Sequence, residues 1–172
     1  MSGRSEIVAR ARALSGGDLG QRARRLVQRL AAPGPLTFED VAAAPDWILW
    51  SETARRDLAR AAGVAACAPQ LRRTIDGRAL RIFAETIGAD RLDALLAAPA
   101  VEGEASGDLP DNLEALTALG AAALRVEAGE RPALARRLAA LLPASTVTLD
   151  RATSRAACAQ ARQWTMLDEE AC

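Results

Sequence analysis

Apolar residues recur at intervals of three and four along most of the chain, which is the spacing of an amphipathic α-helix. In the segment 18–31 they form one stripe, made of Leu19, Ala23, Leu26, Val27 and Leu30. A second helix is predicted over 5–14, and Gly16-Gly17 separates the two. The chain therefore begins with a predicted helical hairpin, which Pro33-Gly34-Pro35 ends.

The same spacing continues to the end of the chain, interrupted by proline and glycine. The predicted helices cover 38–44, 51–66, a short segment from Pro69 to near Asp76, a segment around 80–87 that Gly88 ends, a segment around 92–96 that Pro99 ends, a segment that Asp111 or Asn112 caps and Gly129 ends, 131–142, and about 149–166. In the last of these, Leu149, Ala152, Ala156 and Ala159 share one side. No strand of consequence is predicted.

Composition supports the same fold class, because alanine, leucine and arginine are strong helix formers and β-branched residues are few. We predict an all-α fold for the 172 residues, as a single compact domain of roughly seven to nine short helices. Three parts differ in charge. The hairpin, 1–31, is basic, with seven arginines against Glu6 and Asp18; 99–112 is predicted to be an acidic flexible loop; 168–172 is predicted to be a frayed acidic tail.

The chain contains no histidine, lysine or tyrosine, and its 22 basic residues are therefore all arginine. Without these side chains, imidazole ligands, Schiff-base lysines and the Ser-His-Asp triad are excluded. Cys67, Cys158 and Cys172 have no metal-ligand spacing, and Gly16-Gly17 with Gly20 is not followed by the lysine of a phosphate loop. We therefore expect no catalytic residue, no metal and no cofactor, and we predict that the protein is not an enzyme.

Charge and hydropathy bear on the partners and the location. The 22 acidic residues balance the 22 basic ones, whereas a dedicated nucleic-acid binder usually has a basic excess. No apolar run approaches the roughly 20 residues that span a bilayer, and the start of the chain has no apolar core of a secretory signal. The odd number of cysteines suits a reducing compartment. We expect a soluble, cytoplasmic protein.

Two sets of residues are candidates for binding a protein partner, because tryptophan and arginine dominate binding hot spots. They are Trp47 and Trp50, and the arginine pairs Arg55-Arg56, Arg72-Arg73 and Arg136-Arg137. The alternative for the tryptophans is that they anchor a core that is poor in aromatic residues. The alternative for the arginines is a solvated face with ion pairs between successive turns. On a helix, the members of each pair point about 100° apart.

The stretch from Arg55 to Pro143 resembles a family of cytoplasmic accessory subunits of type III secretion systems, the SctK/YscK/OrgA/MxiK family. The matching segments are Leu58 to Gly63, Leu71-Arg72-Arg73, Ala79-Leu80-Arg81, Ile87-Gly88 with Leu92, an acidic spacer with proline, Leu119 to Leu124, and Arg136 to Pro143. The short arginine-rich start of this chain departs from the family, whose members tend to be longer there.

The resemblance implies a helical, non-enzymatic adaptor of the cytosolic sorting platform. Such a subunit links the cytoplasmic domain of the inner-membrane ring protein to the pod protein of the platform. The family supplies no residue of assigned chemistry. A second hypothesis is a helical regulatory protein that binds nucleic acid through the basic hairpin, 1–31. In that case binding weakens steeply between about 50 and 200 mM salt.

Overall fold

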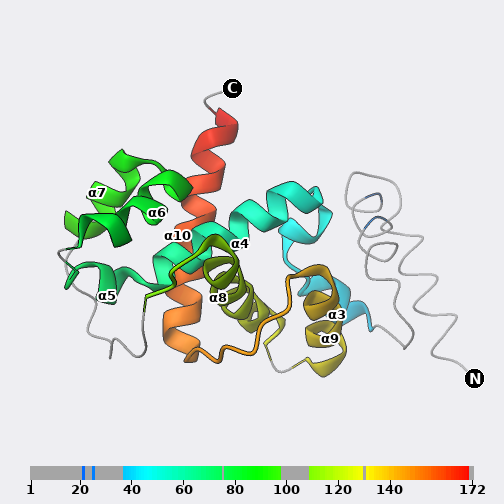
Figure 1. Ribbon diagram of the computed structural model, residues 1–172. Coiled ribbons are helices and arrows are strands. Elements are labelled where there is room, and N and C mark those ends of the chain that lie inside the picture. The colour runs from blue at the N-terminus through cyan, green and yellow to red at the C-terminus, as the bar shows by residue number, and fades with distance from the viewer. Residues whose placement is uncertain are drawn as a thin grey trace, which may run out of the picture. The chain divides into compact units, whose positions relative to one another are not determined.

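The computed structural model describes Gln21, Arg25 and the residues 37–74, 76–97, 109–129 and 131–170. Within these residues every regular element is a helix, so the predicted all-α fold is confirmed (Figure 1). The α-helices are α3 (Phe38–Ala42), α4 (Glu52–Ala66), α5 (Ala68–Leu71), α6 (Gly77–Ile87), α7 (Ala89–Ala97), α8 (Leu113–Arg125), α9 (Pro132–Leu141) and α10 (Arg151–Glu170). Two short 3-10 helices, η2 (Asp46–Leu49) and η3 (Val126–Ala128), complete the set.

Several sequence predictions concern residues outside this description. The hairpin 5–14 and 18–31 belongs to them, apart from Gln21 and Arg25, which are both helical and joined by a side-chain hydrogen bond of 3.2 Å. Residues 99–108, most of the predicted acidic loop 99–112, also lie outside the described residues, as do 98, 171 and 172.

Local signals explain where most helices start and stop. Thr37 and Asp40 form a reciprocal capping box at the start of α3. Asn112 caps α8, accepting a hydrogen bond of 2.8 Å from the N–H of Ala115. Gly88 and Gly129 follow helical segments with φ of +87° and +58°, which favours glycine because it has no Cβ.

Contacts divide the chain into two compact units. One comprises 1–51 and 128–141, and the other comprises 52–127 and 142–172. In the first unit, the described helices are α3, η2 and α9, and Trp47, Ile48 and Leu134 are almost completely buried. Asp40 is also buried there, and its carboxylate lies 3.7 Å from the guanidinium of Arg131.

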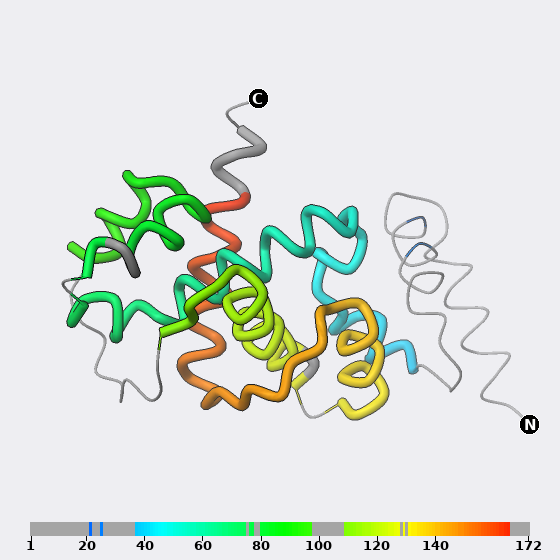
Figure 2. Tube along the Cα trace, in the orientation of Figure 1, coloured from blue at the N-terminus to red at the C-terminus, as the bar shows by residue number. Residues whose placement is uncertain are grey.

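The second unit is built on three long helices, because α8 and α10 both pack on α4 and also contact each other. The core between them contains Leu58, Leu116, Leu124 and Ala161, which have no exposed surface. Helices α6 and α7 form a hairpin through Gly88 and are attached to α4 and α5 (Figure 2). Arg72 fixes this hairpin by donating two hydrogen bonds, of 3.0 and 3.2 Å, to the carbonyl of Leu95.

Helix α10 differs from its prediction in bounds and in orientation. It begins at Arg151, after the cap Asp150, and continues to Glu170, so it includes 168–170, where the sequence predicts a frayed tail. Its buried stripe is Ser154, Ala157, Cys158, Ala161 and Trp164, whereas Ala152, Ala156 and Ala159 are exposed. The alanines offer several equivalent stripes, and burying Trp164 with Cys158 decides between them because a large ring gains more from burial.

Candidate partner-binding groove

The geometry of the second unit depends on a close approach between α4 and α8. Gly63 of α4 and Gly120 of α8 lie where the two helices meet, and a Cβ at Gly120 would lie 1.6 Å from the carbonyl oxygen of Ala59. A Cβ at Gly63 would lie 2.2 Å from the carbonyl oxygen of Leu116. Only glycine allows backbones to approach this closely, so these two residues set how α8 lies on α4.

The start of α8 projects from this crossing with an exposed apolar residue. Asn112 defines the first turn as its cap, and the next residue, Leu113, has 46% of its surface exposed. It is one of three large hydrophobic residues that are exposed in the described part of the chain, with Phe38 and Val147. A leucine at the first helical position contributes little to the core, so its exposure leaves it available to another molecule.

The segment after α9 returns to the same region and is held there by Arg125. The guanidinium of Arg125, at the end of α8, donates hydrogen bonds of 3.0 Å to the carbonyls of both Pro143 and Ser145. A charged group that binds two carbonyls replaces their hydration and fixes the segment without secondary structure. Pro143 and Ala144 are thereby placed beside α8.

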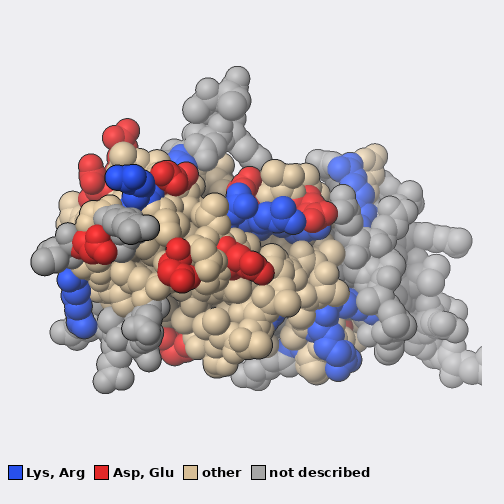
Figure 3. Space-filling view, in the orientation of Figure 1, with Lys and Arg blue, Asp and Glu red and all other residues tan. Residues whose placement is uncertain are grey.

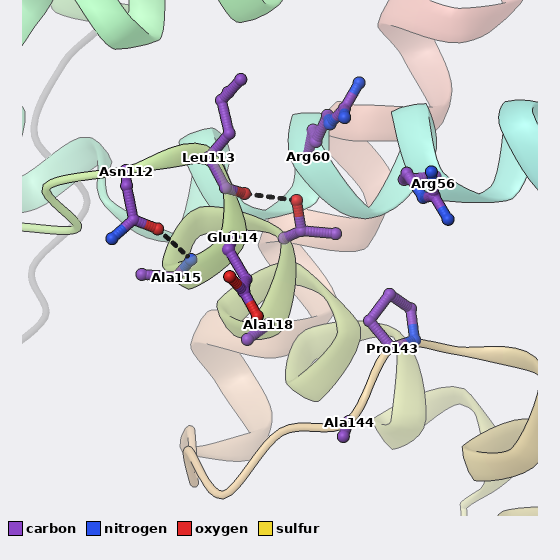
Figure 4. Close-up of a pocket in the computed structure, with 10 residues that line it drawn as sticks. Arg56, Arg60, Asn112, Leu113, Glu114, Ala115, Ala118, Pro143 and Ala144 are labelled. Atoms are coloured by element: carbon purple, nitrogen blue, oxygen red, sulfur yellow. Dashed lines mark hydrogen bonds between the residues drawn. The ribbon is translucent and has the colours of Figure 1, made fainter.

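These three elements enclose an open groove of about 700 Å³ (Figure 4). Helix α4 supplies two arginines, the first two turns of α8 supply most of the floor, and the segment after α9 supplies one edge. The lining residues are Arg56, Arg60, Asn112, Leu113, Glu114, Ala115, Thr117, Ala118, Pro143 and Ala144. All of them belong to the second compact unit. The groove has the size of a small-ligand pocket but is open to solvent, which suits a peptide segment.

The two arginines of the groove are held along α4 by ion pairs with residues of the same helix. Arg56 lies 3.2 Å from the carboxylate of Glu52, and Arg60 lies 3.0 Å from that of Asp57. Both pairs are partly exposed, and such pairs contribute at most about 1 kcal/mol each. The Nε of Arg60 is buried and has no hydrogen-bond acceptor. Figure 3 shows acidic and basic side chains interspersed, with no continuous area of one sign on the visible face.

Only one of the sequence-predicted partner residues lines the groove. Each arginine pair is divided between a more buried and a more exposed member, and in the two helical pairs, Arg55-Arg56 and Arg136-Arg137, the angle between successive helical residues accounts for this. Arg55 and Arg137 are each only 7% exposed and Arg72 is half-buried, whereas Arg56, Arg73 and Arg136 are exposed. Trp47 is 1% exposed and Trp50 is half-buried, which favours core anchoring for Trp47.

Of the residues that line the groove, the sequence predicts Arg56 as a partner-binding residue but not Arg60 or Leu113. The spacing of four residues between Arg56 and Arg60 in a predicted helix indicates that they share a face. Leu113 directly follows the predicted cap Asn112, so its position in the first turn of the helix can also be predicted from the sequence. The return of Pro143 to this region cannot, because it depends on tertiary contacts.

The cysteines of the described part are buried and poorly ionised. Burial raises the pKa of the Cys67 thiol to about 12. Burial, with a further contribution from the carboxylate of Glu127, raises the pKa of the Cys158 thiol to about 12. Thiols with such pKa values are weak nucleophiles at neutral pH, because the thiolate is the reactive form. Glu127 also pairs with Arg162.

Among the residues that the structure describes, no group of three or more histidine, cysteine or carboxylate side chains could hold a metal ion. None of the described helices is long and apolar enough to cross a bilayer. In comparisons with known proteins, no family model, no curated protein and no solved structure matches this chain.

Proposed function

We propose that this protein is a non-enzymatic adaptor that holds a segment of another protein in the groove between α4 and the start of α8. The observation that carries the proposal is the exposed Leu113 at the edge of an open groove of about 700 Å³. Exposed apolar side chains beside charged ones are typical of protein-binding surfaces. Arg56 and Arg60 supply the charged side of this surface.

The resemblance over 55–143 supplies the cellular setting of the proposal. Helix α8, all but the first three residues of α4, and Pro143 at the edge of the groove fall within that stretch. We therefore propose that the adaptor works in the cytoplasm, in the sorting platform of a type III secretion system. Its partners would be the cytoplasmic domain of the inner-membrane ring protein and the pod protein.

Co-purification tests this proposal directly. The tagged chain is mixed with the purified ring-protein domain or pod protein from a type III secretion system of the same cell, and the complex is measured by gel filtration and calorimetry. We expect a complex with at least one of them, and Leu113→Asp should weaken it about tenfold or more because a buried leucine contact is worth about 1.5–3 kcal/mol.

The matched control is Val147→Asp. Val147 is 42% exposed, belongs to the same compact unit and does not line the groove, so this variant should bind as the wild type does. Absence of binding to both proteins would refute the platform assignment. Equal binding by wild type and Leu113→Asp would show that the groove is not the binding surface.

A further inference from the structure

The geometry points to an acidic peptide as the ligand of this groove: we infer that it binds a partner segment in which one or two carboxylates flank an aliphatic or aromatic side chain. The inference rests on the proposed adaptor role and adds the chemistry of the partner. It follows from the hydrogen-bond donors, the small apolar side chains of the lining and the placement of the acidic side chains.

The arginines of the groove have more hydrogen-bond donors than the protein supplies acceptors for. Arg56 and Arg60 each donate one hydrogen bond, to Glu52 and Asp57, and make no other among the described residues. Guanidinium has five N–H donors, so most of them face solvent or the groove. The Nε of Arg60 is buried, so the donors of this residue that a ligand in the groove can reach are those of its terminal nitrogens.

The start of α8 adds two backbone donors to these side chains. The first N–H groups of a helix have no acceptor within the helix, and Asn112 takes only that of Ala115. The N–H groups of Leu113 and Glu114 have no acceptor among the described residues. A carboxylate is the ligand that suits guanidinium donors beside a helix N-terminus.

The lining of the groove is mixed, with small apolar side chains between polar ones, and the apolar part requires more than an anion. Ala115 and Ala118 lie on one face of α8, and Pro143 and Ala144 lie along the edge. The small side chains in the lining leave space for a larger one from the ligand. In Figure 4 the side chains of Leu113 and Arg60 extend in the same direction, away from Pro143 and Ala144. A peptide with a bulky apolar residue next to its carboxylate satisfies both requirements.

The acidic side chains nearby argue against a continuous polyanion such as nucleic acid. Glu114 lines the groove, and Glu52 and Asp57 lie on the same helix as the arginines. A nucleic-acid backbone would place phosphates against all three, whereas a peptide places a carboxylate only where it is needed. Exchange of the present ion pairs for new ones costs little because the present pairs are partly exposed.

Peptide display on the whole protein tests the inference. A phage library of random dodecapeptides is selected on the immobilised wild-type chain, and the recovered peptides are measured by fluorescence polarisation. We expect peptides enriched in Asp or Glu next to Leu, Ile, Val or Phe. The double variant R56E/R60E should bind them about tenfold or more weakly, since two attractive pairs become repulsive.

The control variant is Arg73→Glu, which changes an exposed arginine of the same unit outside the groove and should bind the peptides as the wild type does. Circular dichroism checks the folding of each variant, and R56Q/R60Q replaces the charge-reversed variant if that one does not fold. A labelled duplex oligonucleotide is tested in parallel. Recovery of no peptide, peptides without acidic residues, equal binding by wild type and double variant, or oligonucleotide binding that the double variant abolishes would each overturn the inference.

These outcomes are separate from those of the co-purification. If a platform protein binds but the selected peptides do not depend on the arginines, the ligand chemistry is wrong and the adaptor role stands. If the peptides behave as expected but neither platform protein binds, the acidic-peptide site stands and the platform assignment falls.

Discussion

Replacing Gly120 with alanine should strongly destabilise the unit formed by α4, α8 and α10. The new Cβ would lie 1.6 Å from the carbonyl oxygen of Ala59 and 2.6 Å from the backbone nitrogen of Gly63. Both neighbours are backbone atoms of α4, so no side chain can rotate away, and the two helices must separate. That separation opens the packing of buried residues such as Leu58 and Leu116.

The magnitude follows from two opposing terms. Alanine is intrinsically better than glycine inside a helix by about 0.8–1 kcal/mol. Overpacking usually costs about 1–3 kcal/mol, and a clash between two backbones belongs at or above the upper end of that range. We expect Gly120→Ala to lower the free energy of unfolding by roughly 2–4 kcal/mol net. For a chain of this length the melting temperature then falls by about 5–15 °C.

Guanidinium unfolding followed by circular dichroism measures this change, and Gly77→Ala is the matched control. Gly77 also lies in a helix, but a Cβ there meets nothing within 4 Å, so the control should be neutral or slightly more stable. Gly63→Ala should destabilise as Gly120→Ala does. If Gly120→Ala proved as stable as the wild type, the close crossing of α4 and α8 would be wrong.

Three further predictions concern individual side chains. Asn112→Ala removes the cap of α8 and should cost about 1 kcal/mol in denaturant unfolding; an unchanged midpoint would contradict the capping role. The hydrogen bonds from Thr37 lower the pKa of the Asp40 carboxyl below 3.8. These hydrogen bonds therefore stabilise the folded state above pH 3.8, and this stabilisation is lost as the pH falls through the lower pKa of the folded state. Between about pH 5 and pH 2 the free energy of unfolding should therefore depend less on pH in Asp40→Asn than in the wild type. The same pH dependence in both proteins would contradict a stabilising role of the Asp40 carboxylate. At pH 8 a thiol with a pKa of about 12 is ionised to only about one part in ten thousand, so a thiol reagent should label Cys67 and Cys158 only on unfolding, as peptide mass spectrometry can show.

Most of the described helices could be predicted from the sequence, because their limits are set locally. A capping residue such as Asn112, or a glycine such as Gly88, acts on the turn beside it and is visible in the sequence. Leu116 of α8 and Leu134 and Leu138 of α9, all of which are completely buried, could also be predicted to face inward, because leucine outweighs alanine in the area that it buries.

The orientation of α10 and the groove could not be derived in the same way. In α10 several alanine stripes are nearly equivalent, so the buried face is decided by the helices that pack against it. The groove depends on the approach of Gly63 to Gly120 and on the hydrogen bonds between Arg125 and the segment after α9. Both are contacts between residues far apart in the chain, which no local pattern specifies.

The arginines show why composition alone does not locate a binding surface. In a chain without lysine, arginine is also used for structural purposes: Arg72 satisfies the carbonyl of Leu95, and Arg125 satisfies those of two residues after α9. Planar guanidinium suits this role because it donates two hydrogen bonds at once. An arginine that already binds backbone carbonyls has fewer donors left for a partner. Arginines that use a single donor and are exposed, as Arg56 is, or partly exposed, as Arg60 is, are therefore the ones to test first.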